Sequence, residues 1–512
     1  MSRVLGAALM GVDGIPVEVE VRISSLLPRV DLVGLPEAAV RESTARVHAA
    51  IGAVGEPFPE RRVTVNLAPA GLRKSGAGLD LPIAVGILAA SGVLPAEALE
   101  GLGLLGELAL DGRLRAVRGA LALVLALRDA GCRRVILPTG SAEEAALAPD
   151  VEVRAASDLG AVLLALRGGE ALPLARPAAE VPAAGEAPLD LADVRGQALA
   201  KRALTLAAAG GHALLLRGPP GAGKTMLARR LPGLLPPLGF EEALEATRIH
   251  GAAAEGLQPG LPALVRERPF RAPHHSASPA GILGGGSPPR PGEASLAHRG
   301  VLFLDELPEF DRRVLEALRQ VLEERRVRVA RARGSCVFPA AFQLVAAANP
   351  CPCGWLGTGV RDCRCDDGSV ARYRARLSGP LLDRLDLQVR VPPVAWHDLD
   401  RPDAGPGTRE LRERVALARR TQERRLRHLI VSTNAEIPDS LLDQAVAATP
   451  EARALLGRAV ERLRLSARAA RRVLRVARSA ADLDGETRVG PPALAEALAF
   501  RDDGPAGPGP RD

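Results

Sequence analysis

The chain has 512 residues, a hydrophobic share of 47% and a formal net charge of +7. This length predicts about two to four domains, and the apolar content excludes wholesale disorder. The charge permits nucleic-acid binding without demonstrating it, because arginine richness alone can reflect a GC-rich genome.

The N-terminus predicts no signal peptide, because no charged stretch precedes a long apolar one. No run of about eighteen uncharged apolar residues predicts a membrane helix. We therefore expect a soluble, cytoplasmic protein that has no membrane partner. Four of the six cysteines fall in one short stretch, which in that compartment favours a metal site over disulfides.

Residues 1–166 alternate strand-like and helix-like patterns and predict an α/β domain. Strands are expected at 17–23, 62–67 and 134–137, and helices at 81–90 and 120–130. Residues 167–188 are rich in alanine, proline and glycine without periodicity, which predicts a linker.

Two segments of the first domain, 66–80 and 106–114, resemble the Lon-protease/ribosomal-S5-like fold. Lon-type proteases use a serine–lysine dyad, and those two positions fall near Gly78 and Leu121. Neither residue can perform that chemistry, and the nearby Ser75 has no evident lysine partner. We therefore expect a non-proteolytic accessory or assembly module, with an active protease as the alternative.

A second α/β unit is expected over 189–396, and its main feature is the pattern G-x-x-x-x-G-K-T. The residues are Gly218, Pro219, Pro220, Gly221, Ala222, Gly223, Lys224 and Thr225. An apolar run at 212–217 precedes them and a helix-like segment at 226–231 follows. Such a loop turns backbone N–H groups onto phosphate, and the helix start adds positive potential.

Lys224 would reach the β- and γ-phosphates of ATP, and Thr225 would hold Mg²⁺ through its hydroxyl. The alternative is a chance glycine turn. Only three lysines occur in the chain, and one of them occupies this position. We therefore favour a P-loop.

Residues 300–306 predict a buried strand that ends in Asp305 and Glu306. The carboxyl ends of strands form the ligand-binding edge of an open α/β sheet. We expect Asp305 in the Mg²⁺ shell and Glu306 beside the attacking water. A third strand at 343–348 ends at Asn349, which would orient the water or the γ-phosphate; the alternative is a turn-forming asparagine before proline.

Arg384 is a candidate arginine finger, which would reach the nucleotide of a neighbouring subunit. The alternative is an ordinary surface arginine.

The loop 351–365 contains the pattern C-x-C-x₉-C-x-C, formed by Cys351, Cys353, Cys363 and Cys365. Four thiolates in two close pairs suit a tetrahedral zinc ion that staples the loop. We favour structural Zn²⁺ over four unliganded thiols. Cys132 and Cys336 are expected to be ordinary buried thiols.

Helical periodicity at 408–428, 451–481 and 491–500 predicts a helical lid over 405–501. Between 401 and 478 the chain has 18 arginines against 9 acidic residues and no lysine. That charge would either contact DNA or remain on solvated helix faces. Residues 502–512 are expected to form a disordered tail.

Long motifs at 268–275, 290–298, 301–310 and 349–354 resemble the YifB/ComM family of bacterial magnesium-chelatase-like AAA+ ATPases. These proteins are related to the ATPase subunit of magnesium chelatase and to MCM helicases. The resemblance covers nearly the whole chain and implies a hexameric, ATP-hydrolysing ring. It also implies the DNA-helicase activity of ComM-type members, which act in branch migration during recombination of transforming DNA.

The resemblance implies further roles. The glycine- and proline-rich segment 281–293, which cannot be a regular helix, corresponds to the helix-2 insert of related motors. The segment 325–334 corresponds to the presensor hairpin that lines the pore, with Arg331 and Arg333 as candidate DNA contacts. A solvated strand face is the alternative for this charge run.

Arg468 matches the sensor-2 arginine of MCM-like motors, with Arg471 and Arg472 as rivals. His274 and His275 show no metal-ligand spacing, and their role stays open between structural and nucleotide-proximal.

Two functions follow. The first is a DNA translocase or helicase. The second is a protein- or cofactor-remodelling chaperone, like the chelatase relatives, with a protein partner on the N-terminal domain. Insertion of metal into a porphyrin is disfavoured, because nothing resembles a tetrapyrrole pocket.

Overall fold

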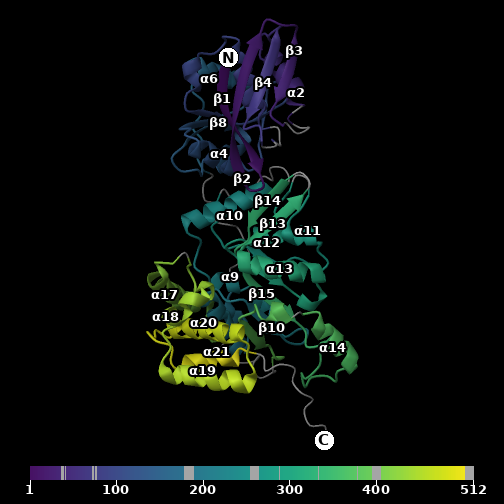
Figure 1. The fold of residues 1–512 in the computed structure, drawn as a ribbon, viewed down its shortest axis with the longest axis vertical. Helices are drawn as coiled ribbons and strands as arrows, with labels where there is room; N and C mark the ends of the chain where they lie inside the picture. The colour runs from purple at the N-terminus through teal and green to yellow at the C-terminus, as the bar shows by residue number, and fades with distance from the viewer. Residues whose placement is uncertain are drawn as a thin grey trace.

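The structure, a computed structural model, describes residues 1–501 apart from some short segments. Those left out are 36–39, 41, 72–73, 75–77, 178–188, 254–263, 287–288, 332–333, 378, 395–404 and 430, and for 331 and 334 only the backbone is described. Ser75, Arg333 and the predicted tail at 502–512 therefore lie outside the described residues. The chain is elongated, with the N-terminal sheet at one end and the C-terminal helices at the other (Figure 1).

The N-terminal part is built on a mixed seven-stranded sheet in the order β3-β4-β2-β1-β5-β8-β9. Its strands are β1 (Ser2–Met10), β2 (Asp13–Ser24), β3 (Arg29–Val33), β4 (Arg62–Ala68), β5 (Leu102–Leu104), β8 (Arg134–Pro138) and β9 (Glu152–Ala156). A separate two-stranded ribbon comprises β6 (Glu107–Leu108) and β7 (Leu114–Arg115). The helices are α2 (Ser43–Ala53), α3 (Asp80–Ala90), α4 (Ala120–Asp129), α5 (Thr139–Ala145) and α6 (Leu159–Leu166). Every strand and helix expected in this region is present.

The positions that correspond to a Lon-type dyad are structural. Leu121 is fully buried in an apolar cluster on α4, and a Cβ at Gly78 would contact Val117. Lys74 is also buried, and its Nζ donates to the carbonyl oxygens of Gly34, Leu67 and Pro69. Burial lowers the pKa of Lys74. These three carbonyl oxygens satisfy the hydrogen-bond donors of the buried ammonium group, which gives Lys74 a structural role in this fold.

The first part of the predicted linker is attached to this sheet. Ala175 N donates to Val153 O at 2.9 Å, and Ala155 N donates to Pro173 O at 3.0 Å. Leu172 is buried in the core beneath. Backbone pairing with β9 is a tertiary contact, so the composition of residues 171–175 alone did not indicate it.

The middle of the chain forms a parallel five-stranded sheet in the order β11-β12-β15-β10-β16. The strands are β10 (Leu214–Arg217), β11 (Phe270–Arg271), β12 (Val301–Leu304), β15 (Gln343–Ala348) and β16 (Leu387–Arg390). Alternate residues of β10 enter two separate apolar cores, Leu214 and Leu216 on one face and Leu215 on the other. Because all five strands are parallel, their carboxyl ends meet at one edge.

Helices and a hairpin complete this unit. The helices are α7 (Ala198–Gly210), α8 (Lys224–Ala228), α9 (Leu231–Leu234), α10 (Phe240–Ala253), α11 (Pro279–Leu283), α12 (Glu293–Leu296), α13 (Arg312–Glu324), α14 (Asp367–Ala375) and α15 (Gly379–Leu382). The hairpin pairs β13 (Arg326–Arg331) with β14 (Gly334–Pro339), as expected. One expectation was wrong, because the helix predicted at 226–231 is interrupted before Leu231. As expected, the segment 281–293 does not form one regular helix, although its two ends belong to the short helices α11 and α12.

The C-terminal part is helical: α17 (Thr408–Leu426), α18 (Leu442–Val446), α19 (Pro450–Leu463), α20 (Ala467–Leu483) and α21 (Pro491–Ala499). The helical stretch predicted at 451–481 is two helices, because Arg464 adopts a left-handed φ of 51° and Ser466 caps α20. These helices share one apolar core with α7 and the sheet. No helix among the described residues is long and apolar enough to cross a membrane.

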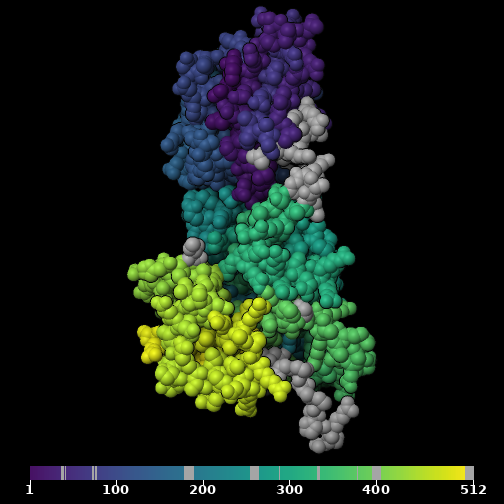
Figure 2. Space-filling model, viewed as in Figure 1, coloured from purple at the N-terminus to yellow at the C-terminus, as the bar shows by residue number. Residues whose placement is uncertain are grey.

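The N-terminal domain packs directly against the hairpin β13–β14 (Figures 1 and 2). Val12, in the turn between β1 and β2, is fully buried in the cluster that contains Phe338 of β14. Asp13 pairs with Arg248 of α10 at 3.1 Å. In the opposite direction, Leu244 of α10 is buried in an apolar cluster of the N-terminal domain. A shift of the hairpin would therefore change its contact with the N-terminal domain.

Candidate active site

The segment 218–223 connects β10 to α8 as a tight loop at the carboxyl edge of the sheet. Gly223 has a φ of 87°, in the region where residues with a side chain are strained. A Cβ at Gly218 would lie 2.2 Å from the carbonyl oxygen of Val391, so only glycine fits there. The loop therefore has the backbone freedom that a phosphate cradle requires.

Lys224 is buried within this loop. Its Nζ donates to Gly218 O at 2.8 Å, to Pro219 O at 2.9 Å and to Asn349 Oδ1 at 3.0 Å. Burial lowers the pKa of Lys224, and the carboxylates of Asp305 and Glu306 oppose that shift. The ammonium group is thus held among carbonyl oxygens in the cradle, where an anion can reach it.

The two residues expected to hold Mg²⁺ are in contact. Thr225 Oγ1 donates to Asp305 Oδ2 at 2.7 Å, which joins the start of α8 to the end of β12. A hydroxyl and a carboxylate oxygen are the hard ligands that Mg²⁺ accepts alongside water and substrate phosphates. The donor set therefore fits a Mg²⁺ ion, which when bound would neutralise phosphate charge.

Glu306 follows Asp305 with an unusual backbone. Its φ is 52°, a left-handed conformation that is uncommon outside glycine, and its side chain is exposed. Its N–H donates to Asp305 Oδ1 at 3.0 Å. Such strain is concentrated at functional sites, since the surrounding structure must hold it in place.

His275 is a site residue whose role the sequence left open. Its Nδ1 lies 3.3 Å from Glu306 Oε2, and its ring lies 4.1 Å from that of His274. His275 is therefore positioned to orient the carboxylate of Glu306. No spacing rule links these positions, because the contact depends on how β11 and β12 pair.

Asn349 lies at the end of β15, where it contacts Lys224. Its backbone N–H also donates to the phenol oxygen of Tyr373 on α14, and burial raises the pKa of Tyr373 to about 12. The three predicted elements at 218–225, 305–306 and 349 thus converge at one sheet edge.

Arg384 lies elsewhere and is only 6% exposed. Its guanidinium pairs with Glu323 of α13 and donates to Pro380 O at 2.7 Å. The structure therefore does not present Arg384 as a free surface side chain. A role at a neighbouring subunit's nucleotide would require the pair with Glu323 to open.

The three lid candidates have different surroundings. Arg468 is exposed in the first turn of α20, and Arg471 contacts Asp439. Arg472 donates to Asp386 Oδ1 at 2.6 Å and to the Arg384 carbonyl oxygen at 2.9 Å. Arg472 thus ties the lid to the segment that contains Arg384.

Asp386 is the centre of this lid contact. It also accepts from His212, at 3.3 Å, and from the Ala213 N–H, at 3.2 Å. Burial by itself would raise the pKa of Asp386, but the hydrogen bond from His212 and the charge of Arg472 hold it well below its usual range.

The four cysteines at 351, 353, 363 and 365 lie together, with all four Sγ atoms within 4.8 Å of one another. Among the remaining thiols, Cys132 is buried as expected. Cys336 is only partly buried, because it lies on the hairpin β13–β14 rather than in a core.

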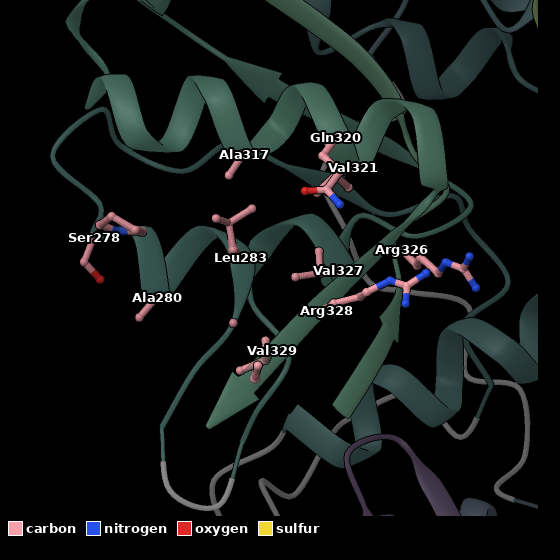
Figure 3. A pocket seen from close by; sticks show the side chains of 13 residues that line it. Ser278, Ala280, Leu283, Ala317, Gln320, Val321, Arg326, Val327, Arg328 and Val329 are labelled. Atoms are coloured by element: carbon pink, nitrogen blue, oxygen red, sulfur yellow. The ribbon is translucent and has the colours of Figure 1, made fainter. Parts of the chain in front are cut away.

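The hairpin carries its charge outward. Val327 and Val329 are buried, whereas Arg326 and Arg328 are exposed. Apolar side chains of α11, α13 and β13 line a pocket beside the hairpin, and Arg326 and Arg328 extend from its edge (Figure 3). Of the two predicted DNA contacts, Arg331 is the last residue of β13, and Arg333 is outside the described residues.

The sheet order, with a P-loop after β10, which lies between β15 and the edge strand β16, and acidic residues after β12, defines a P-loop ATPase core of the AAA+ class. Sequence models of magnesium chelatase subunit ChlI match residues 190–399 and 19–141, and one of its C-terminal domain matches 405–501. The chain belongs to the YifB/ComM family of magnesium-chelatase-like AAA+ ATPases.

Relatives match almost end to end. An uncharacterized protein of Mycobacterium tuberculosis is 46% identical over 508 residues, which are 98% of this chain and 99% of that protein. Competence protein ComM of Haemophilus influenzae is 44% identical over 505 residues, 98% of this chain and 97% of ComM. YifB of Escherichia coli, also uncharacterized, is 43% identical over 503 residues, 98% of this chain and 97% of YifB.

Proposed function

We propose that this protein is an Mg²⁺-dependent ATPase that assembles into a ring, most simply a hexamer, and translocates DNA in the cytoplasm. The hairpin β13–β14 carries the DNA part of the proposal, because its valines are buried and its arginines face outward. The name competence protein, borne by the relative ComM, agrees with a role in DNA uptake. Recombination or branch migration of incoming DNA is the reaction class that we infer.

The lid is a weaker candidate for the DNA surface than the hairpin. Many of its arginines are already paired with carboxylates: Arg425 and Arg478 with Asp482, Arg471 and Arg475 with Asp439, Arg453 with Asp443, and Arg472 with Asp386. On the hairpin, the ion pairs of Arg326 and Arg328 among the described residues are with the partly exposed Glu324, at 3.4 and 3.2 Å. Such pairs near the surface contribute little to stability, so a phosphate group could replace the carboxylate at small cost.

In the proposed reaction, Glu306 accepts a proton from the attacking water while Lys224 and Asn349 position the γ-phosphate. His275 orients the carboxylate of Glu306. Hydrolysis would alter the contacts of the lid through Arg472 and Asp386. The hairpin and α11 line the same pocket and would move together (Figure 3).

DNA should stimulate ATP turnover, and the stimulation should weaken with salt. Raising salt from about 50 to 200 mM would lower DNA affinity by roughly 10³-fold if about six phosphates are contacted. Turnover is measured with single-stranded and branched DNA at both salt concentrations. R328A and R331A should reduce the stimulation and leave basal turnover unchanged. R409A, at an exposed arginine on α17, is the control.

Turnover indifferent to all DNA would favour the second candidate, a chaperone that remodels a protein client. The contact of Val12 with the hairpin cluster supports that alternative, because it links the hairpin to the N-terminal domain.

Arg384 provides a test of the ring. R384A should assemble but hydrolyse ATP on the order of 10³-fold more slowly, since an arginine finger stabilises transition-state charge. Mixing R384A with K224A, each inactive alone, should restore part of the activity, because the K224A subunit supplies Arg384 to its neighbour's intact site. If rings shown to contain both variants recover no ATP turnover, Arg384 does not act on a neighbouring subunit, and its role is the structural pair with Glu323.

A further inference from the structure

We propose that the four-cysteine loop is a zinc site that holds the P-loop in its phosphate-binding shape, so that the metal controls nucleotide affinity. The coupling rests on the proposed ATP binding, whereas the metal site stands independently of it. Three features support the proposal: the arrangement of the sulfur atoms, the hydrogen bonds around them, and the contacts between this loop and residues 218–224.

The sulfur atoms have the spacing of one tetrahedral ion. Cys351 Sγ lies 3.4 Å from Cys353 Sγ and 3.6 Å from Cys363 Sγ, and Cys353 Sγ lies 3.6 Å from Cys363 Sγ. Thiolates about 2.3 Å from a central zinc ion would be about 3.8 Å apart. A disulfide would need about 2.05 Å. The set is too tight for an iron–sulfur cluster, so a single soft ion fits best.

Backbone N–H groups support the sulfur atoms. Cys353 N donates to Cys365 Sγ and Leu356 N donates to Cys351 Sγ, both at 3.4 Å. Such contacts orient metal ligands and stabilise thiolates. Arg361 lies 4.9 Å over the ring of Trp355 within the same loop. Residues 351–365 contain no helix or strand, so a metal would supply the order that backbone hydrogen bonding does not.

The loop and the residues just before it contact the P-loop at two points. Gly354, with a φ of 84°, packs so closely that a Cβ there would lie 2.5 Å from Pro220 Cδ. Two residues before Cys351, Asn349 accepts the hydrogen bond from Lys224 Nζ. Both contacts are made by residues that flank the first cysteine pair, Cys351 and Cys353. Loss of the metal would therefore loosen the packing on Pro220 and the contact of Asn349 with Lys224 together.

The test combines metal analysis with nucleotide affinity. We expect the purified full-length protein to hold about one zinc per chain by elemental mass spectrometry. The double variant C363S/C365S, changed at the pair farther along the chain from the P-loop, should lose that zinc. Its affinity for a fluorescent ATP analogue with Mg²⁺ should fall at least tenfold. C336S, at a thiol outside the cluster, should change neither quantity.

A second variant keeps the proposal testable if the cysteine changes unfold the loop. G354A should retain zinc, because no ligand is lost, yet weaken the analogue at least tenfold by displacing Pro220. Unchanged affinity in a zinc-free chain overturns the coupling, and iron in place of zinc overturns the choice of metal. A zinc-loaded wild type that binds no ATP overturns the proposed function instead.

Discussion

Replacing Lys224 with alanine should weaken binding of a fluorescent ATP analogue by about 100-fold or more, equivalent to roughly 2.7 kcal/mol. The ammonium group lies inside the P-loop, on the carbonyl oxygens of Gly218 and Pro219, and alanine puts no charge there. ATP turnover at subsaturating ATP should fall at least as far. Equilibrium titration of the analogue in the presence of Mg²⁺ measures the effect.

M226A is the matched control, because Met226 lies on the same short helix with 40% of its surface exposed. It should bind the analogue as the wild type does. Thermal unfolding without nucleotide shows whether K224A is folded. A folded K224A chain that binds the analogue normally would contradict the assignment of the phosphate cradle.

Glu306→Gln should slow ATP turnover by about 10²- to 10⁴-fold, the usual contribution of a general base. ATP affinity should remain close to that of the wild type. Glutamine matches glutamate in size and leaves the contact of Thr225 with Asp305 intact, but it cannot accept the proton from water. Single-turnover hydrolysis together with analogue binding separates the two quantities.

Glu309→Gln is the control for this variant. Glu309 follows three residues later and pairs with Arg376, so its change should leave turnover unchanged. H275A should give an intermediate loss of turnover if His275 orients the Glu306 carboxylate. Wild-type turnover by E306Q would rule out Glu306 as the base.

The strongest predictions concerned segments whose pattern and chemistry are local. The strands at 301–304 and 343–348 were evident because apolar residues run up to a polar one. The helix break at Arg464 was missed, since the periodicity of 451–481 continues across it and only a left-handed backbone interrupts it. The paired edge segment at 171–175 was missed because its composition resembles that of a linker.

The candidate nucleotide-binding residues could be proposed before any fold was known, since phosphate and Mg²⁺ demand particular side chains at short, regular spacings. The contacts of Arg384 with Glu323 and of His275 with Glu306 were not recognisable in this way. The packing of Gly354 on Pro220 and of Val12 beside the hairpin was likewise not recognisable from the sequence. These contacts join residues far apart in the chain, and only the packing of helices and sheets decides which such residues meet.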